Sequence, residues 1–368
     1  MPSVLLVTQD LDRAGAQRQC VELALGLHAR PGWRVEVAAL EPDGPLAAEL
    51  AAAGIALHSC PRRWRWDLGP AHRLAALARG GRFEIVHSFL FLPNFYARLA
   101  RVMHRPPLTI SSLRSTGIEG LPRYVAEVLL APLCDLIIAN SEAGRGDLIS
   151  RGVRASRVVV VRNGLDLDRF LALPPPPARR TGPPRLGMVA QIEPRKDHAG
   201  LVRAFAEVLK RHPGAGLVLA GDGRLRPRVE ALARTLGLQD RVEFPGTVSG
   251  SERVYDRLDL YVQASAGQEG TSNSIVEAMA AGRPVVATDI GGNAETVVHG
   301  VTGLIVPAFD PVVLGASICA LLDDPDTSER MGRAGRERAR TIYSRTRMID
   351  ETIAAYERAL ASVPRITT

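Results

Sequence analysis

Short, almost continuously apolar runs alternate with longer amphipathic stretches along the first half of the chain. The apolar runs fall at 4–7, 34–40, 55–58, 84–87, 108–112, 136–139 and 158–161, and helical patterns separate them at 16–29, 46–53, 71–79, 94–103, 123–133 and 142–150. Short runs of this kind are typical of strands that are buried on both faces of a parallel sheet. The pattern therefore predicts an α/β domain in which helices cover a parallel sheet.

The same alternation starts again after residue 184. Strands are predicted at 186–190, 217–220, 242–244, 260–263, 285–288 and 304–306, and helices at 199–211, 225–236, 274–281, 293–299, 311–322, 328–341 and 347–361. Prolines at 174–177, 183 and 184 separate the two halves and predict a stiff linker. Because 368 residues exceed what one core usually holds, we expect Rossmann-like domains at 1–165 and 185–345, a linker at 166–184 and a last helix in 346–368.

Composition adds few restrictions. A hydrophobic fraction of 46% and a charged fraction of 23% are ordinary for a soluble globular protein, and no apolar run approaches the ~20 residues of a membrane span. The N-terminus lacks the features of a signal peptide, and the four cysteines show no CxxC spacing, which favours reduced thiols in a cytoplasmic protein. The net charge of +7 indicates an anionic partner.

The stretch 267–282 carries the strongest candidate chemistry. Glu269 and Glu277 flank small polar residues of the kind that cap helices, so a helix is expected to begin between Ser272 and Ser274 and to end before Gly282. A helix N-terminus attracts a phosphate, and two flanking carboxylates can take neutral hydroxyls of the same ligand. The alternatives are a capping box between Ser274 and Glu277 and an ordinary solvated carboxylate at position 269.

This stretch reads Glu269-Gly-Thr-Ser-Asn-Ser-Ile-Val-Glu277-Ala-Met-Ala-Ala-Gly-Arg-Pro-Val-Val-Ala287 and resembles the two-glutamate signature of family-4 glycosyltransferases. The resemblance implies a GT-B fold, with two Rossmann-like domains facing a cleft and a C-terminal helix that crosses back to the first domain. It also implies that Glu269 faces the donor sugar and is catalytic, and that Glu277 holds the ribose. The intervening residues expected to bind the nucleotide-sugar are Gly270, Thr271, Ser272 and Asn273.

A second motif follows the first strand of the second half, at 188–199. It resembles the family segment in which an arginine and a lysine grip the donor diphosphate. Lys196 falls on the lysine position, but Gln191 replaces the arginine, and Arg195 is the nearest basic residue that could supply the charge. Only two of the 46 basic residues are lysines, which makes Lys196 more informative than a solvated surface lysine would be.

Candidate ligand-facing residues in the first half are weaker. Gly15, in a loop that resembles the glycine-rich first loop of the family, and Asn163 with Gly164 would line the cleft, although all three also fit plain turns. His87 ends an apolar strand, where parallel sheets place ligand-facing groups. The family often has a second histidine two residues later, where this chain has Phe89, so His87 is either catalytic or a packing residue.

The sequence predicts neither a metal nor a cofactor. The triplets Asp10-Leu-Asp12 and Asp166-Leu-Asp168 resemble the metal-binding motif of transferases with another fold. Asp166 and Asp168 more readily cap the turn after Gly164. Fixed cations and a helix N-terminus would then stabilise the charge that develops on the leaving phosphate.

The loop Arg62-Arg-Trp-Arg-Trp66 places tryptophans among arginines, which suits an anionic membrane surface, and 123–131 is a second candidate face. No nucleic-acid-binding fold is indicated, and a solvated charged loop is the simpler alternative. We expect a cytoplasmic protein that meets the inner face of the membrane peripherally.

The expected function is retaining transfer of a hexose or N-acetylhexosamine from a nucleotide-sugar, with UDP-sugars favoured. The acceptor is a glycan, a lipid-linked or cell-envelope precursor, or a small molecule. A nucleotide-sugar epimerase of the same fold and a sugar-nucleotide-binding protein without turnover are the alternatives. A dehydrogenase is disfavoured because Gly221-Asp-Gly223 lacks the third glycine of a dinucleotide motif, and neither lysine follows a glycine as in a P-loop.

Overall fold

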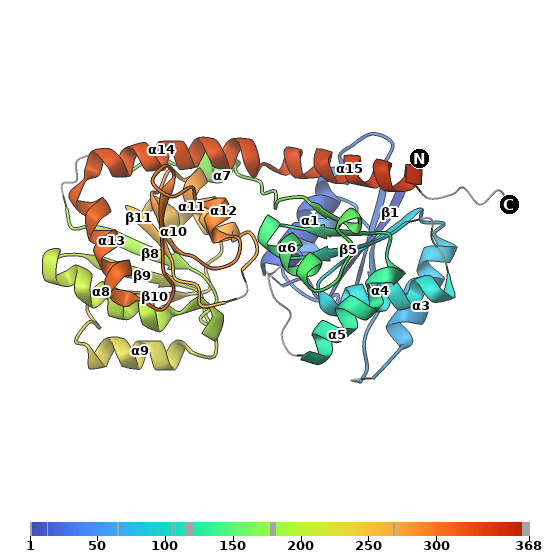
Figure 1. The fold of residues 1–368 in the computed structure, drawn as a ribbon, viewed down its shortest axis with the longest axis horizontal. Helices are drawn as coiled ribbons and strands as arrows, with labels where there is room; N and C mark the ends of the chain where they lie inside the picture. The colour runs from blue at the N-terminus through green and yellow to red at the C-terminus, as the bar shows by residue number, and fades with distance from the viewer. Residues whose placement is uncertain are drawn as a thin grey trace. The chain divides into compact units, whose positions relative to one another are not determined.

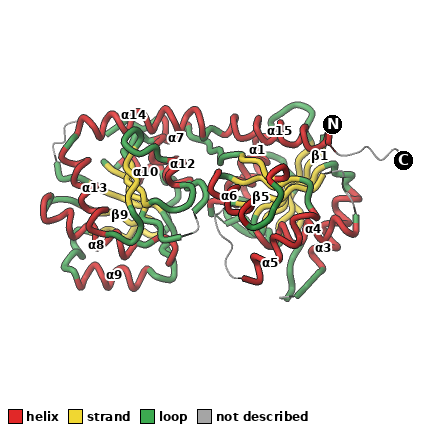
Figure 2. The backbone as a smooth tube through the Cα atoms, viewed as in Figure 1, coloured by secondary structure: helices red, strands yellow, loops and turns green. Residues whose placement is uncertain are grey.

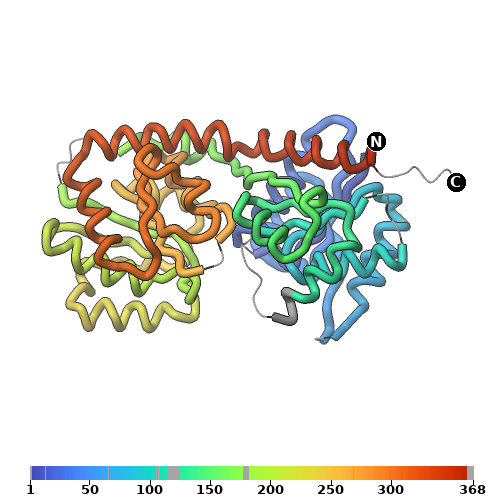
Figure 3. Tube along the Cα trace, in the orientation of Figure 1, coloured from blue at the N-terminus to red at the C-terminus, as the bar shows by residue number. Residues whose placement is uncertain are grey.

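The computed structural model describes residues 2–362, apart from residues 13, 65, 105, 107, 115–120, 177–181 and 268 and the side chains of 121–124. The chain forms two compact units (Figure 1, Figure 3). Unit 1 combines Met1–Leu165 with Ser344–Thr368, and unit 2 is Asp166–Tyr343. Each unit is built on its own sheet.

Unit 1 contains a seven-stranded sheet in which every neighbouring pair is parallel. The strands are yellow in Figure 2. The strands are β1 (Ser3–Thr8), β2 (Arg34–Ala39), β3 (Leu57–Ser59), β4 (Ile85–Phe89), β5 (Leu108–Leu113), β6 (Leu136–Ala139) and β7 (Val158–Val160). Their spatial order is β3-β2-β1-β4-β5-β6-β7. The order reverses between β1 and β4, which is the point at which such sheets bind ligands.

Alternate side chains of β1 enter two different cores. Val4 and Leu6 pack with α1 (Gly15–His28) and the C-terminal helix α15 (Arg345–Ser362), whereas Leu5 and Val7 pack with α3 (Gly69–Gly80) and α4 (Phe91–Met103). The remaining helices of this unit are α2 (Ala47–Ala52), α5 (Leu121–Leu130), α6 (Glu142–Ser150) and the short 3-10 turns Ala131–Leu133 and Ala155–Arg157. The sheet is therefore covered on both faces, as the apolar strands predict.

Unit 2 contains a six-stranded parallel sheet in the order β10-β9-β8-β11-β12-β13. Its strands are β8 (Arg185–Val189), β9 (Gly216–Ala220), β10 (Val242–Gly246), β11 (Leu260–Gln263), β12 (Val285–Thr288) and β13 (Gly303–Val306). The order reverses between β8 and β11. Both sheets thus have the doubly wound arrangement of a Rossmann fold, which confirms the predicted fold class.

The two faces of the unit 2 sheet also differ. Leu260 and Val262 of β11 join a large core with α8 (His198–Arg211), α9 (Arg226–Thr235) and α13 (Pro311–Asp323). Tyr261, on the other face, contacts the ring of Tyr255 in α10 (Glu252–Asp256). The remaining helices are α7 (Asp168–Leu171), α11 (Asn273–Ala280), α12 (Asn293–Thr296), α14 (Pro325–Ile342) and a 3-10 turn at Pro194–Lys196.

Part of the expected linker is built into unit 2. The described residues 166–176 contain α7, which contacts α10 and α11. The guanidinium group of Arg336 donates to the carbonyls of Leu171 and Leu173, and Arg283 donates to that of Pro174 at 3.0 Å. Proline content alone does not reveal such docking, because the carbonyls of this segment find their partners far along the chain.

Candidate active site

The carboxyl ends of β8 and β11 are neighbours at the switch point of unit 2 and carry the two loops singled out by sequence. Backbone hydrogen bonds join these loops, since the Ala266 N–H donates to the Arg195 carbonyl at 2.8 Å. The Gly292 N–H, after β12, donates to the Glu269 carbonyl at 3.1 Å. Three successive strand ends are thereby tied into one site.

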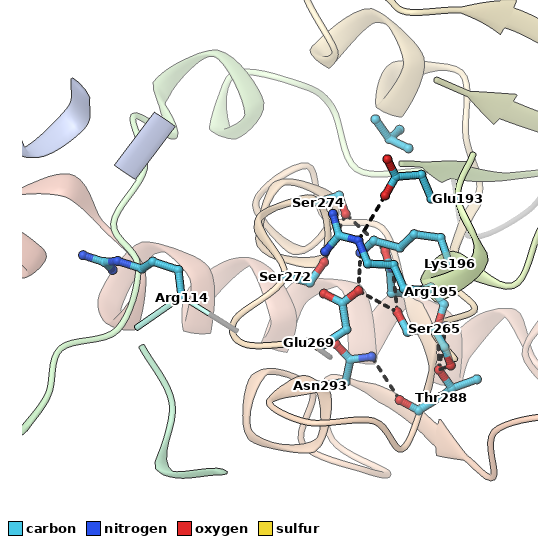
Figure 4. A network of polar contacts seen from close by, with 12 residues as sticks. Arg114, Glu193, Arg195, Lys196, Ser265, Glu269, Ser272, Ser274, Thr288 and Asn293 are labelled. Carbon is cyan, nitrogen blue, oxygen red and sulfur yellow. Dashed lines mark hydrogen bonds and ion pairs between the residues drawn. The ribbon is translucent and has the colours of Figure 1, made fainter. Parts of the chain in front are cut away.

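Lys196 and Glu269 form an ion pair inside this site (Figure 4). Their side chains are only 10% and 6% exposed, so both charges are held away from water. Burial lowers the pKa of Lys196, and the carboxylate of Glu269 opposes part of that change. A buried charged pair at the switch point of a doubly wound sheet is a candidate for function, because its desolvation is costly.

A chain of hydrogen bonds orients Glu269 from behind. Burial raises the pKa of Tyr261, whose hydroxyl donates to Gln263 Oε1 at 2.7 Å. The amide Nε2 of Gln263 then donates to Ser265 Oγ at 3.0 Å, and Ser265 Oγ donates to Glu269 Oε1 at 3.2 Å. Gln263 and Ser265 each accept one hydrogen bond and donate the next, so the series ends at the Glu269 carboxylate, which accepts the last one.

Helix α11 begins at Asn273, within the predicted range, with Ser272 at its N-cap position. Ser274 therefore lies within the first turn and does not act as the cap, which excludes the capping box between Ser274 and Glu277. Oε2 of Glu277 instead accepts from Tyr255 Oη at 3.0 Å and from Ser251 Oγ at 3.3 Å. Burial and the Glu277 charge raise the pKa of Tyr255, so this phenol remains a donor.

The small residues between the two glutamates gather at the same place. Gly270, Thr271 and Ser272 are buried and Asn273 is half-buried at the N-terminus of α11. Ser272 and Ser274 lie 3.1 Å apart through their hydroxyls, and Ser274 Oγ donates to Gln263 Oε1 at 3.1 Å. The helix end, Glu269 and the buried amide of Gln263 thus form one connected polar site. Figure 4 shows Ser272 and Ser274 beside Glu269 and Ser265.

Of the basic residues predicted after β8, only Lys196 is brought into contact with Glu269. Gln191 is exposed, and Nε of Arg195 lies 3.3 Å from Glu193 Oε2 near the surface. Asp197 follows Lys196 with a φ of 22° and caps α8 by accepting from the Gly200 N–H at 2.9 Å. This strained residue turns the chain sharply after Lys196.

The glycines of Gly221-Asp-Gly223 have a steric role. Gly221 has a φ of 145°, and a Cβ atom there would lie 1.9 Å from the Ala190 carbonyl oxygen. The loop after β9 passes directly against the loop after β8 and supports it. Only glycine permits this approach, so the pair of glycines shapes the site from outside.

His87 is fully buried in unit 1, and both ring nitrogens have protein partners. Nδ1 lies 2.6 Å from Tyr356 Oη, Nε2 lies 2.8 Å from Ser112 Oγ, and the ring stacks on Phe89 at 4.5 Å. Burial holds the pKa of His87 well below its usual range. These contacts favour the packing interpretation of His87 over the catalytic one.

Asn163 and Gly164 are also buried and anchor the end of unit 1. Gln19 in α1 binds both the N–H and the carbonyl of Gly164 at 3.0 Å. A Cβ atom at Gly164 would lie 2.4 Å from Met348 Cβ, so a glycine lets α15 pack against this turn. Gly15 forms the first residue of α1.

Comparison with known proteins agrees with this architecture. The sequence model of "Glycosyltransferase Family 4" matches residues 13–169, and that of "Glycosyl transferases group 1" matches residues 172–338. A D-inositol 3-phosphate glycosyltransferase of Kribbella flavida is 30% identical over 315 residues, which cover 78% of this chain and 74% of that protein. The chain belongs to the family-4 glycosyltransferases.

Solved structures show the same fold as this glycosyltransferase. Anabaena Alr3699/HepE in complex with UDP has a TM-score of 0.85 at 22% identity, over 97% of this chain and all of that one. Sucrose-phosphate synthase from Thermosynechococcus elongatus has a TM-score of 0.83 at 22% identity, over 98% of this chain and all of that one. A glycogen synthase of Mycobacterium tuberculosis is 28% identical over 80% of this chain and 69% of that protein.

In both Asp-x-Asp triplets of the glycosyltransferase, the first aspartate accepts hydrogen bonds from nearby groups of the chain itself. Asp10 Oδ1 accepts from the Asp12 N–H at 3.1 Å and from Gln17 Nε2 at 2.8 Å. Asp166 Oδ1 accepts from the Asp168 N–H at 3.3 Å, as expected for a turn. These contacts are those of capping side chains.

Sequence reasoning missed Gln263, Tyr255 and Arg114. Gln263 left a signal, because it is a polar residue at the end of the apolar strand Leu260–Gln263. Tyr255 belongs to α10, a helix of one turn that the hydrophobic pattern did not predict. Arg114 follows β5 and stands among many arginines, so nothing in the sequence distinguishes it.

Proposed function

We propose that this glycosyltransferase moves a hexose or N-acetylhexosamine from a UDP-sugar to its acceptor, with retention at the anomeric carbon and without a metal ion. The observation that carries the proposal is the buried Lys196–Glu269 pair beside the N-terminus of α11. Helix dipole, ammonium group and carboxylates there match the charges and hydroxyls of a nucleotide-sugar.

Each of these groups has a distinct part in the reaction. Breaking the bond to the sugar develops negative charge on the leaving diphosphate, which Lys196 and the backbone N–H groups of α11 stabilise. Glu277, held by Tyr255 and Ser251, accepts from the ribose hydroxyls. Glu269, held by Ser265, contacts the sugar near the reacting carbon.

The choice of UDP draws support from similar proteins. The Anabaena structure of the same fold contains UDP, and a second structure of that protein contains UDP-glucose. At an identity of 22%, this likeness extends to the fold and not to the particular sugar. The fixed cation Lys196 supports transfer without a metal, because it supplies charge where a divalent ion would otherwise be needed.

Incubation of the purified chain with a panel of UDP- and GDP-sugars tests the proposal. Release of UDP on addition of an acceptor extract, with the α-anomer formed from an α-linked donor, is the expected result. An epimerase would isomerise the donor without any acceptor, and a binding protein would bind UDP without releasing it from the donor. Either of those outcomes, or release that requires added magnesium or manganese after EDTA treatment, would contradict the proposal.

For the acceptor, we propose a lipid-linked or cell-envelope molecule met at an anionic membrane surface. Trp64 and Trp66 are 59% and 71% exposed, and Arg62 and Arg63 beside them are exposed as well, while Arg65 lies outside the described residues. Exposed indoles with neighbouring cations suit a membrane interface. None of the described helices is both long and apolar enough to span a bilayer.

The local structure supports an outward-facing loop. Asp67 accepts from the N–H groups of Arg63 at 2.9 Å and Gly69 at 2.7 Å, and its carbonyl accepts from Tyr96 Oη at 2.9 Å. These bonds fix the base of the loop while its indoles face outward. On α5, Val125 and Leu129 are also exposed, at 42% and 69%.

Sedimentation with phosphatidylglycerol vesicles tests this part of the proposal. Wild type should pellet at low salt and less at high salt, and a variant with Arg62, Arg63 and Arg65 changed to serine should remain in the supernatant. The matched control replaces three exposed arginines of unit 2, Arg224, Arg228 and Arg234, by serine and should pellet like wild type. Equal sedimentation of both triple variants would count against a membrane role for this loop.

A further inference from the structure

Arg114 stands at the carboxyl edge of the unit 1 sheet, directly after β5. Its side chain is only partly buried, and the guanidinium carbon lies 5.0 Å from the centre of the Phe89 ring. Nη1 donates to Asn163 Oδ1 at 3.0 Å and Nη2 donates to Ser112 Oγ at 3.3 Å. These two bonds and the ring hold the guanidinium group in one orientation.

The described groups around Arg114 carry no balancing negative charge at neutral pH. Burial raises the pKa of Cys20 to about 12 and raises that of Tyr356 well above its usual range, so both stay protonated. His87 stays neutral because burial lowers its pKa, and Asn163 and Ser112 are uncharged. Burial also lowers the pKa of Arg114, to about 10, which still leaves it charged.

Three other buried or partly buried arginines of unit 1 pair with a carboxylate. Arg98 contacts Glu127 at 2.5 Å, with both side chains almost fully buried. Arg101 contacts Asp135 at 2.8 Å, and Arg345 pairs with Glu22. Among the residues that the structure describes, Arg114 pairs with no carboxylate, and its buried Nε has no hydrogen-bond partner. Such a charge is costly unless an anion completes the site.

We propose that Arg114 binds an oxyanion, a phosphate or a carboxylate, carried by the acceptor substrate. The carboxyl ends of parallel strands are where this class of fold binds ligands, and a planar guanidinium group matches two oxygens of one anion. Calling the anion part of the acceptor rests on the proposed function. The site itself does not, because it is a fixed cation at the ligand-binding edge of unit 1 that has no carboxylate partner in the described part of the chain.

Calorimetric titration with methyl phosphate tests the site in the full chain. UDP is present at saturation, so that phosphate binding at the proposed donor site in unit 2 is blocked. Wild type should bind methyl phosphate, and Arg114→Gln should weaken binding by about tenfold or more, since a charged hydrogen bond is lost. The matched control Arg79→Gln removes one exposed arginine of α3 and should leave binding within about twofold.

A second variant separates binding from folding. Arg114→Lys keeps the positive charge but loses the planar guanidinium group that can bind two oxygens at once. It should therefore bind methyl phosphate more weakly than wild type and more tightly than Arg114→Gln. A purely structural role would lower the melting temperature of Arg114→Gln without changing the affinity of the folded protein. The proposal is overturned if wild type binds neither methyl phosphate nor acetate, or if folded Arg114→Gln binds every anion that wild type binds with an affinity within twofold of wild type.

Two further arms identify the anion and keep the proposals distinct. Titration with acetate under the same conditions decides between phosphate and carboxylate, because only the preferred oxyanion should show a loss in Arg114→Gln. If UDP itself fails to bind, the proposed donor function fails, yet the difference between wild type and Arg114→Gln still measures the Arg114 site. A donor site that works beside an Arg114 that binds neither anion would overturn only this inference.

Discussion

Replacing Lys196 by methionine should destabilise unit 2 strongly, because it leaves the Glu269 carboxylate buried without its counter-ion. The two side chains are 10% and 6% exposed, so water cannot take over the lost contact without rearrangement. Removing one partner of a buried pair costs about 3–5 kcal/mol. For a unit the size of residues 166–343, that corresponds to a melting temperature lower by about 6–20 °C.

Glu269→Gln should act in the same direction, since it leaves the ammonium group of Lys196 buried without a carboxylate. The double variant Lys196→Met with Glu269→Gln removes both charges, and its stability should return to within about 1–2 kcal/mol of wild type. The two single losses together exceed the loss in the double variant, so the expected coupling free energy between the two positions is about 4–9 kcal/mol. The double variant should nevertheless lose sugar transfer, because both proposed donor contacts are gone.

Thermal unfolding followed by circular dichroism, with urea titration for the free energies, measures the cycle. Lys210→Met is the matched control, since the only other lysine is 71% exposed and pairs with Glu207 at the surface. It should melt like wild type. Strictly additive effects, or single variants as stable as wild type, would refute the idea that the pair is a coupled, buried unit.

Three further outcomes are expected. Glu277→Ala should lose UDP affinity by about tenfold or more in calorimetry. Tyr255→Phe should raise the donor KM by less than Glu277→Ala does and should leave kcat unchanged, because Tyr255 acts on the donor through that carboxylate. A lowered kcat with a normal KM would argue against the ribose role. Burial and the Lys196 charge lower the pKa of His198 to about 4 in the folded chain. In the unfolded chain the pKa of His198 is about 6.5, so below that pH the unfolded state binds the proton first. The free energy of unfolding should therefore fall by roughly 3 kcal/mol between pH 6.5 and 4. His198→Gln should reduce that fall in urea titrations. Gln263→Leu should fold but lower kcat, since Ser265 loses its donor and Glu269 its fixed orientation; unchanged kcat would show that the hydrogen-bond chain does not serve the reaction.

The local sequence pattern was sufficient to predict most elements and the fold class. Predicted and observed strands differ by two residues or fewer at their ends, because strands that are largely buried on both faces are also largely apolar. The motif at 267–282 likewise located the start of α11, since small polar residues are favoured at helix N-termini wherever the helix lies. Membership of the glycosyltransferase family followed from the same residues.

The contacts that define the site depended on tertiary structure. Hydrophobic periodicity determines which face of a strand is buried, but it does not say that β8 lies beside β11 and brings Lys196 to Glu269. The same limit applies to Tyr255 with Glu277, and to His87, whose partners Tyr356 and Ser112 come from distant segments. A side chain's charge and exposure are set by neighbours that meet only when the sheet is assembled, and for that reason Arg114 differs from other arginines only in the folded chain.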